Sequence, residues 1–127
     1  MKINVPISVG ELFDKISILE IKTQKIKDTD KLTFINHELK LLKNIAKKKK
    51  LNRKIILSIY EKLKRINKRL WIIEERKRNF ESHKNFNKEF ITLARNVYLL
   101  NDKRAKLKFK INVISGSEIK EIKSHNK

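Results

Sequence analysis

Two polar residues interrupt the apolar pattern of the segment ARNVYLLNDKRAKL, residues 94–107. If this segment is helical, Asn101 and Arg104 fall inside the arc of apolar side chains. Burying a cation is costly unless an opposite charge faces it. Either a carboxylate of the protein or an anionic ligand must therefore pair with Arg104.

Two arrangements meet this requirement. In the one that we favour, Arg104 pairs with a carboxylate on a facing helix, Glu74 or Glu20, while Asn101 fixes the register of helix packing. In the other, polar and basic side chains form a pocket for an anionic metabolite. The residues of this candidate polar cluster or anion pocket are Lys15, Lys22, Glu74, Arg95, Asn101 and Arg104.

Other reactive side chains are too scattered to form a catalytic or metal site. His37, His83 and His125 stand in separate segments, and the chain has no cysteine. Glu74 and Glu75 are adjacent, so on a helix they point to different faces and make a poor acid–base pair. Because glycine-rich phosphate loops are also absent, we expect no metal, no cofactor and a binding protein rather than an enzyme.

The formal net charge of +19 suggests nucleic-acid binding through a basic surface. Lysine outnumbers arginine, however, and isoleucine and asparagine are abundant, a composition that an AT-rich genome produces without selection for binding. Trp71 and Tyr60 follow the apolar pattern, which is typical of packing anchors rather than of base-stacking platforms. The candidate basic patch comprises Lys47, Lys48, Lys49, Lys50, Arg53, Arg65 and Arg69.

The spacing of apolar residues predicts four helices. Ser8 is expected to cap the first helix in a capping box with Glu11, Thr29 or Asp30 the second, and Asn87 the fourth. The predicted helices cover about residues 9–27, from 29 or 30 to the lysine run that ends at 50, 54–82 and 88–114.

The predicted fold is an all-α antiparallel bundle of about four helices, two of them long, in a single domain over residues 1–127. Residues 1–7 form a short extended arm, and residues 115–127 a flexible or short tail in which Gly116 ends the fourth helix. The first helix carries a second apolar edge at Ile18 and Ile21, and such a surplus face favours a homodimer.

The chain contains no apolar run long enough to span a bilayer and no signal-peptide pattern at its start. Together with the absence of cysteine, this predicts a cytoplasmic protein that does not associate with membranes.

Three segments resemble a family of small, uncharacterised bacterial helical proteins, a domain of unknown function. The segments are VPISVGELFDKISILEIK, LWIIE and FITLARNVYLLNDKRAKLKFKIN, the last followed by GSEIKEIKS. The resemblance implies a helical fold but no activity, cofactor or functional residue. The segment GELFDKISILE also faintly resembles the first helix of helical chorismate mutases, but the arginine expected there is missing.

We therefore expect a non-catalytic helical-bundle protein that acts through protein–protein interaction, as a homo-oligomer or with another protein. The first alternative is RNA or DNA binding through the basic surface. The second is a small enzyme or sensor that binds an anionic metabolite.

Overall fold

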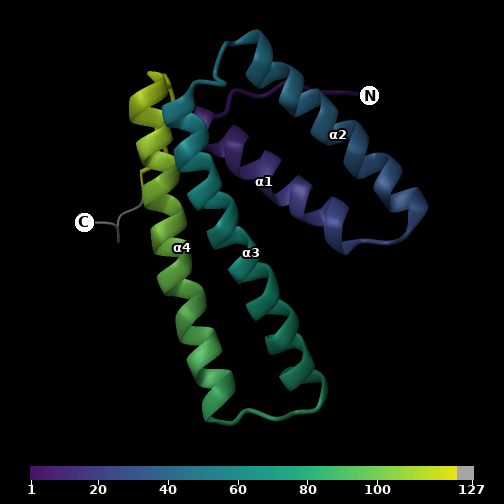
Figure 1. The fold of residues 1–127 in the computed structure, drawn as a ribbon. Helices are drawn as coiled ribbons and strands as arrows, with labels where there is room; N and C mark the ends of the chain where they lie inside the picture. The colour runs from purple at the N-terminus through teal and green to yellow at the C-terminus, as the bar shows by residue number, and fades with distance from the viewer. Residues whose placement is uncertain (123–127) are drawn as a thin grey trace.

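The computed structural model describes residues 1–122 and contains four α-helices joined by short loops (Figure 1). No strand occurs in this described part of the chain. The helices are α1, Val9–Lys25; α2, Thr29–Lys48; α3, Lys54–Ser82; and α4, Lys88–Ser115. The all-α bundle predicted from apolar spacing is confirmed, and two of its helices are long.

The helix ends follow from local side chains. The Ser8 hydroxyl accepts a hydrogen bond from the Glu11 amide, and the Asn87 side chain accepts one from the Phe90 amide, so both predicted caps are confirmed. The predicted cap of α2 is wrong by one or two residues: the Asp28 side chain accepts hydrogen bonds from the amides of Asp30 and Lys31. Helix α1 ends at Lys25, two residues earlier than predicted.

The C-terminal end of α4 follows the predicted pattern. Gly116 lies in the left-handed region, with φ of 71°, and ends the helix as predicted. The last helical residue is Ser115, one residue later than predicted. Residues 1–8 form an arm with no helix or strand, and residues 116–122 do not continue α4. The rest of the predicted tail, 123–127, lies outside the described residues.

Helix α1 is the centre of the bundle. Its backbone lies close to those of α2, α3 and α4, whereas the backbone of α2 lies close only to that of α1 among the helices, and α1 is seen between α2 and α3 in Figure 1. Ile21 is 1% exposed and Ile18 is half-buried, so most of the second apolar edge of α1 is covered by the chain itself. This edge therefore gives little support to the homodimer, which stays a prediction.

The core has two parts. The larger joins all four helices around Phe13, Ile56, Leu63 and Ile111. The smaller lies between α3 and α4 only, where the two helices extend beyond α1 as an antiparallel pair (Figure 1). Its buried residues are Leu70, Ile73, Leu93 and Leu100. The 3-4 spacing of α3 predicted this seam correctly.

Helices α1 and α4 cross closely at Gly10. A Cβ placed there would lie 2.3 Å from the Lys108 carbonyl oxygen and 2.9 Å from Asn112 Oδ1. The Gly10 amide donates to that same Oδ1 at 2.6 Å. Glycine is therefore required by the close approach of two backbones.

We predict that Gly10→Ala lowers the free energy of unfolding by about 1–3 kcal/mol, because the methyl group pushes α1 away from α4. Chemical denaturation followed by circular dichroism measures the change. An unchanged or higher stability would mean that the two helices do not approach at Gly10 as closely as the structure places them.

Candidate functional site

Asp14 is the centre of a buried polar network between α1, α3 and α4. Its side chain is 1% exposed, and both carboxylate oxygens accept hydrogen bonds from the Arg104 guanidinium, Oδ1 from Nε at 2.9 Å. The Asn67 amide also donates to Asp14 Oδ1, at 2.9 Å, and to the Ser17 hydroxyl at 2.7 Å. We call Asp14, Ser17, Asn67, Asn101, Arg104 and Lys108 the Asp14 network.

Each of the two cations of the network, Arg104 and Lys108, has at least one carboxylate partner. Lys108 donates to Glu11 at 2.6 Å and to Glu121 at 3.0 Å, and it lies 4.0 Å from Asp14. The Arg104 Nη1 atom donates to Asn101 Oδ1 at 3.3 Å. The charges are thus balanced within the protein, and no external anion is needed to compensate them.

The network shifts the pKa values of its members. Burial alone would raise the pKa of Asp14, but hydrogen bonds from Arg104 and Asn67 and the charges of Arg104 and Lys108 lower it below 3.8. Burial opposes the charge of Lys108, yet hydrogen bonds to Glu11 and Glu121 raise its pKa above 10.5. At neutral pH Asp14, Arg104 and Lys108 therefore all stay ionised.

The lowered pKa of Asp14 predicts an acid-dependent loss of stability. A carboxyl group with a depressed folded-state pKa stabilises the fold above its unfolded value, 3.8, and this contribution is lost as pH falls through the folded pKa. We expect the free energy of unfolding to fall more steeply below pH 3.8 in the wild type than in Asp14→Asn. Denaturation titrations over this range measure both slopes, and parallel curves would contradict the assignment.

The predicted cation is correct, but the predicted carboxylate is wrong. Arg104 pairs with Asp14 on α1, and not with Glu74 or Glu20. Glu74 pairs with Lys77 on its own helix, and Glu20 with Lys43 and Lys64.

Only two members of the candidate polar cluster come together, Asn101 and Arg104. Lys15 is exposed and pairs with Glu11 at 3.9 Å, and Arg95 is exposed on α4. Among the described residues, Arg104 forms no ion pair or hydrogen bond with Lys15, Lys22, Glu74 or Arg95. The six residues therefore do not line one anion pocket.

Asp14, Asn67 and Lys108 were missed, although the sequence carried a signal for two of them. Asp14 precedes Ile18 by four residues and Ile21 by seven, so it lies on the same buried edge of α1. Lys108 follows Arg104 by four residues and shares its face of α4. No local pattern marked Asn67.

A second feature is a groove between α3 and α4 with a volume of about 510 Å³. Ile66 and Leu107, both half-buried, form its apolar part. Its other lining residues are all cations, from both helices: Lys62, Arg65, Arg69, Lys103 and Lys106. We call this the basic groove.

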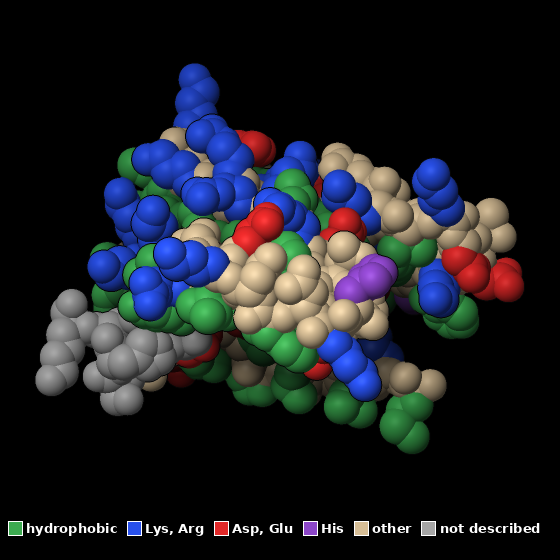
Figure 2. Space-filling model, turned by 90° about the horizontal axis from the view of Figure 1, so that it is seen from below, with side chains coloured by type: hydrophobic (Ala, Val, Ile, Leu, Met, Phe, Trp, Pro, Cys, Tyr) green, Lys and Arg blue, Asp and Glu red, His purple; other side chains and the backbone are tan. Residues whose placement is uncertain are grey.

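The five cations of the basic groove are exposed, and no carboxylate lines it. None of the five forms an ion pair within residues 1–122. In the view of Figure 2, Lys and Arg side chains gather toward the left, the side on which α3 and α4 lie in Figure 1. The groove therefore concentrates positive charge at one place.

The predicted basic patch is divided by the structure. Arg65 and Arg69 line the basic groove, whereas Lys47–Lys50 lie at the end of α2 and the loop that follows. Arg53 stands between them at the start of α3 and donates to the Ile114 carbonyl at 2.9 Å. At 1.5 Å per residue, Arg53 and Arg65 are about 18 Å apart along α3. Lys103 and Lys106 complete the groove from α4 and were not included in the predicted patch.

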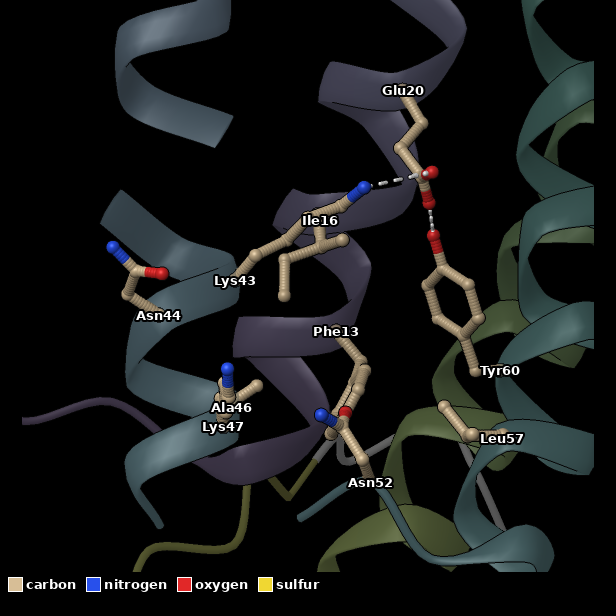
Figure 3. A pocket seen from close by; sticks show the side chains of 10 residues that line it. All are labelled: Phe13, Ile16, Glu20, Lys43, Asn44, Ala46, Lys47, Asn52, Leu57 and Tyr60. Carbon is tan, nitrogen blue, oxygen red and sulfur yellow. Dashed lines mark hydrogen bonds and ion pairs between the residues drawn. The ribbon is translucent and has the colours of Figure 1, made fainter. Parts of the chain in front are cut away.

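A third feature is a half-open pocket of about 350 Å³ between α1, α2 and α3 (Figure 3). The backbones of α2 and α3 do not approach each other closely, and the pocket lies in the space between them beside α1. We call it the α1–α2–α3 pocket. Within residues 1–122, no group of three or more His, Cys, Asp or Glu side chains is placed to hold a metal ion, and no helix is long and apolar enough to cross a membrane.

The comparisons with known proteins give one match. A family described as "Family of unknown function (DUF6165)" matches residues 1–127, the whole chain. This confirms the resemblance to a domain of unknown function seen in the sequence. No curated protein and no solved structure matches the chain significantly.

Proposed function

The chain belongs to this family of unknown function, and from its structure we propose that it is a non-catalytic protein that binds the phosphodiester backbone of a nucleic acid in the basic groove. The observation that carries the proposal is the set of five cations in one groove without a carboxylate among them. Protein surfaces ordinarily intersperse both signs of charge. A concentration of one sign is typical of a surface that binds the opposite charge.

The spacing of the cations favours an extended anion over a small one. Lys62, Arg65 and Arg69 occupy a stretch of about 10 Å along α3, and the two lysines of α4 lie on the opposite wall. Consecutive phosphates of one strand can contact both walls, whereas a single small anion reaches only part of the set. The arginine side chains can bind phosphate oxygens bidentately.

The groove favours contact with the backbone rather than with bases. No aromatic side chain lines it, so it offers no platform on which bases could stack. The sequence preference should therefore be weak. By contrast, the neutralised Asp14 network gives no support to an anionic-metabolite enzyme at Arg104, because its cations already have carboxylate partners.

Lysine acetylation with and without a short mixed-sequence DNA duplex tests the proposal. With duplex, we expect Lys62, Lys103 and Lys106 to be protected from the reagent, as measured by mass spectrometry. Lys47–Lys50, which lie in the other basic segment, serve as the internal control and should remain reactive. Equal protection of both segments, or protection of neither, would contradict binding in the basic groove.

Self-association through α4 is a second candidate function, and it retains the homodimer expected from the sequence. Ile91, Tyr98, Phe109 and Val113 lie on one side of α4, interspersed with Arg95 and Asp102, and are 40–58% exposed. Exposed apolar side chains along one helix favour a second copy or another protein as partner.

Sedimentation equilibrium of the wild type and of Tyr98→Glu tests self-association. We expect a dimer that the substitution dissociates, while Phe34→Glu, at an exposed aromatic residue on α2, leaves it intact. A monomeric wild type at all concentrations would rule this candidate out.

A further inference from the structure

The α1–α2–α3 pocket combines apolar walls with unbalanced positive charge. Phe13 and Ile16 form its back, and Leu57 and Tyr60 form the wall contributed by α3 (Figure 3). The Phe13 and Tyr60 rings contact each other with centroids 5.7 Å apart, which fixes the shape of this wall. Leu57 is 39% exposed, so an apolar side chain is available for further contact.

One end of the pocket is closed by a neutralised carboxylate. Glu20 accepts a hydrogen bond from the Tyr60 hydroxyl and forms ion pairs with Lys43 at 3.4 Å and Lys64 at 3.7 Å. In Figure 3, Glu20 and Lys43 lie at the upper end of the pocket. With two ammonium groups beside it, Glu20 does not oppose the entry of an anion.

The other end of the pocket carries three exposed polar side chains. Lys47, beside Ala46, and Asn52, by Phe13, lie at the lower end in Figure 3, and Asn44 lines the side formed by α2. In the described part of the chain, none of these three side chains forms a hydrogen bond or ion pair. Counting Glu20, Lys43 and Lys47, the charged groups that line the pocket carry one excess positive charge.

We propose that the α1–α2–α3 pocket binds a small amphipathic carboxylate, with its aromatic or alkyl body on Leu57, which is 39% exposed, and on the accessible edges of Phe13, Ile16 and Tyr60, which are 3–7% exposed, and with its carboxylate on Lys47. The volume of about 350 Å³ lies at the lower end of the range for ligand pockets, which suits one ring or a short chain. The Asn44 and Asn52 amides can donate further hydrogen bonds to the same carboxylate. This site is independent of the basic groove, on a different side of α3.

The probe that tests the proposal is 3-phenylpropionate, titrated into ¹⁵N-labelled protein and followed by NMR. We expect saturable shifts of amides around Phe13, Ala46 and Tyr60, and intermolecular NOEs from the ring of the probe to the Phe13 and Tyr60 rings. The neutral isostere 3-phenyl-1-propanol should bind markedly more weakly because it lacks the charge.

Two variants make the test specific. Lys47→Met should weaken the binding of 3-phenylpropionate about three-fold or more, the range expected for a partly exposed charge pair. Lys48→Met, at an exposed neighbour that does not line the pocket, should leave it unchanged. Absence of saturable shifts, equal binding of the alcohol, shifts confined to the basic groove, or equal affinities of the two variants would each overturn the proposal.

Discussion

Asp14→Ala should destabilise the protein by about 3–5 kcal/mol, the cost typical of removing one partner from a buried ion pair. The substitution leaves the Arg104 guanidinium without its carboxylate and removes one of the two acceptors of the Asn67 amide. Because Asp14 joins α1 to both α3 and α4, its loss weakens the contacts of the central helix with these two helices. Urea denaturation monitored by circular dichroism measures the change.

The matched control is the adjacent Lys15→Ala. Lys15 is exposed, and its only ion pair within the described residues is with Glu11 at 3.9 Å, so we expect a change within about 0.5 kcal/mol. The double variant Asp14→Leu/Arg104→Met should be more stable than the sum of the single changes predicts, because it removes both charges together. Additive effects in that cycle would contradict an energetic coupling between Asp14 and Arg104.

Replacing the five cations of the basic groove by glutamine should lower the affinity for a DNA duplex on the order of 10³-fold at low salt. The variant comprises Lys62→Gln, Arg65→Gln, Arg69→Gln, Lys103→Gln and Lys106→Gln. All five side chains are exposed, so the fold should persist. Its stability should even rise slightly, because like charges no longer repel one another.

The matched control removes the same number of charges elsewhere, through Lys2→Gln and glutamine at each of Lys47–Lys50. Fluorescence anisotropy with a labelled duplex measures both variants under one condition. The control should lose far less affinity, since it changes the net charge equally but leaves the groove intact. Equal losses in the two variants would mean that binding depends on net charge alone, and not on a site.

Most helix positions were predictable because residues close together in the sequence mark the ends and the apolar faces of the helices. The capping hydroxyl of Ser8, the long 3-4 seam of α3 and the glycine after α4 are all signals within a few residues. That α1 packs against all three other helices was not predictable in this way. Its two apolar edges indicate two covered faces, but only packing decides whether a face is covered by the same chain or by another copy.

The sites were less predictable because their partners are distant in sequence. Arg104 required a carboxylate, yet Asp14 lies 90 residues away, and which carboxylate of α1 meets Arg104 depends on how the two helices pack. Likewise, Arg65 and Arg69 were recognised, but Lys103 and Lys106 join them only because α3 and α4 are antiparallel. The lysine run at 47–50, the most conspicuous basic segment, lies at the end of α2 and in the loop that follows, outside the basic groove.

The central claim, that the basic groove is the nucleic-acid site, is tested most directly by the salt dependence of binding. The measurement compares log Kobs against log salt concentration for the wild type, the groove variant and the charge-matched control. Five phosphate contacts predict a wild-type slope of about −4.5 on duplex DNA. The slope of the charge-matched control should stay close to that of the wild type, and the slope of the groove variant should approach zero. A slope that is the same in the groove variant as in the wild type would contradict the account.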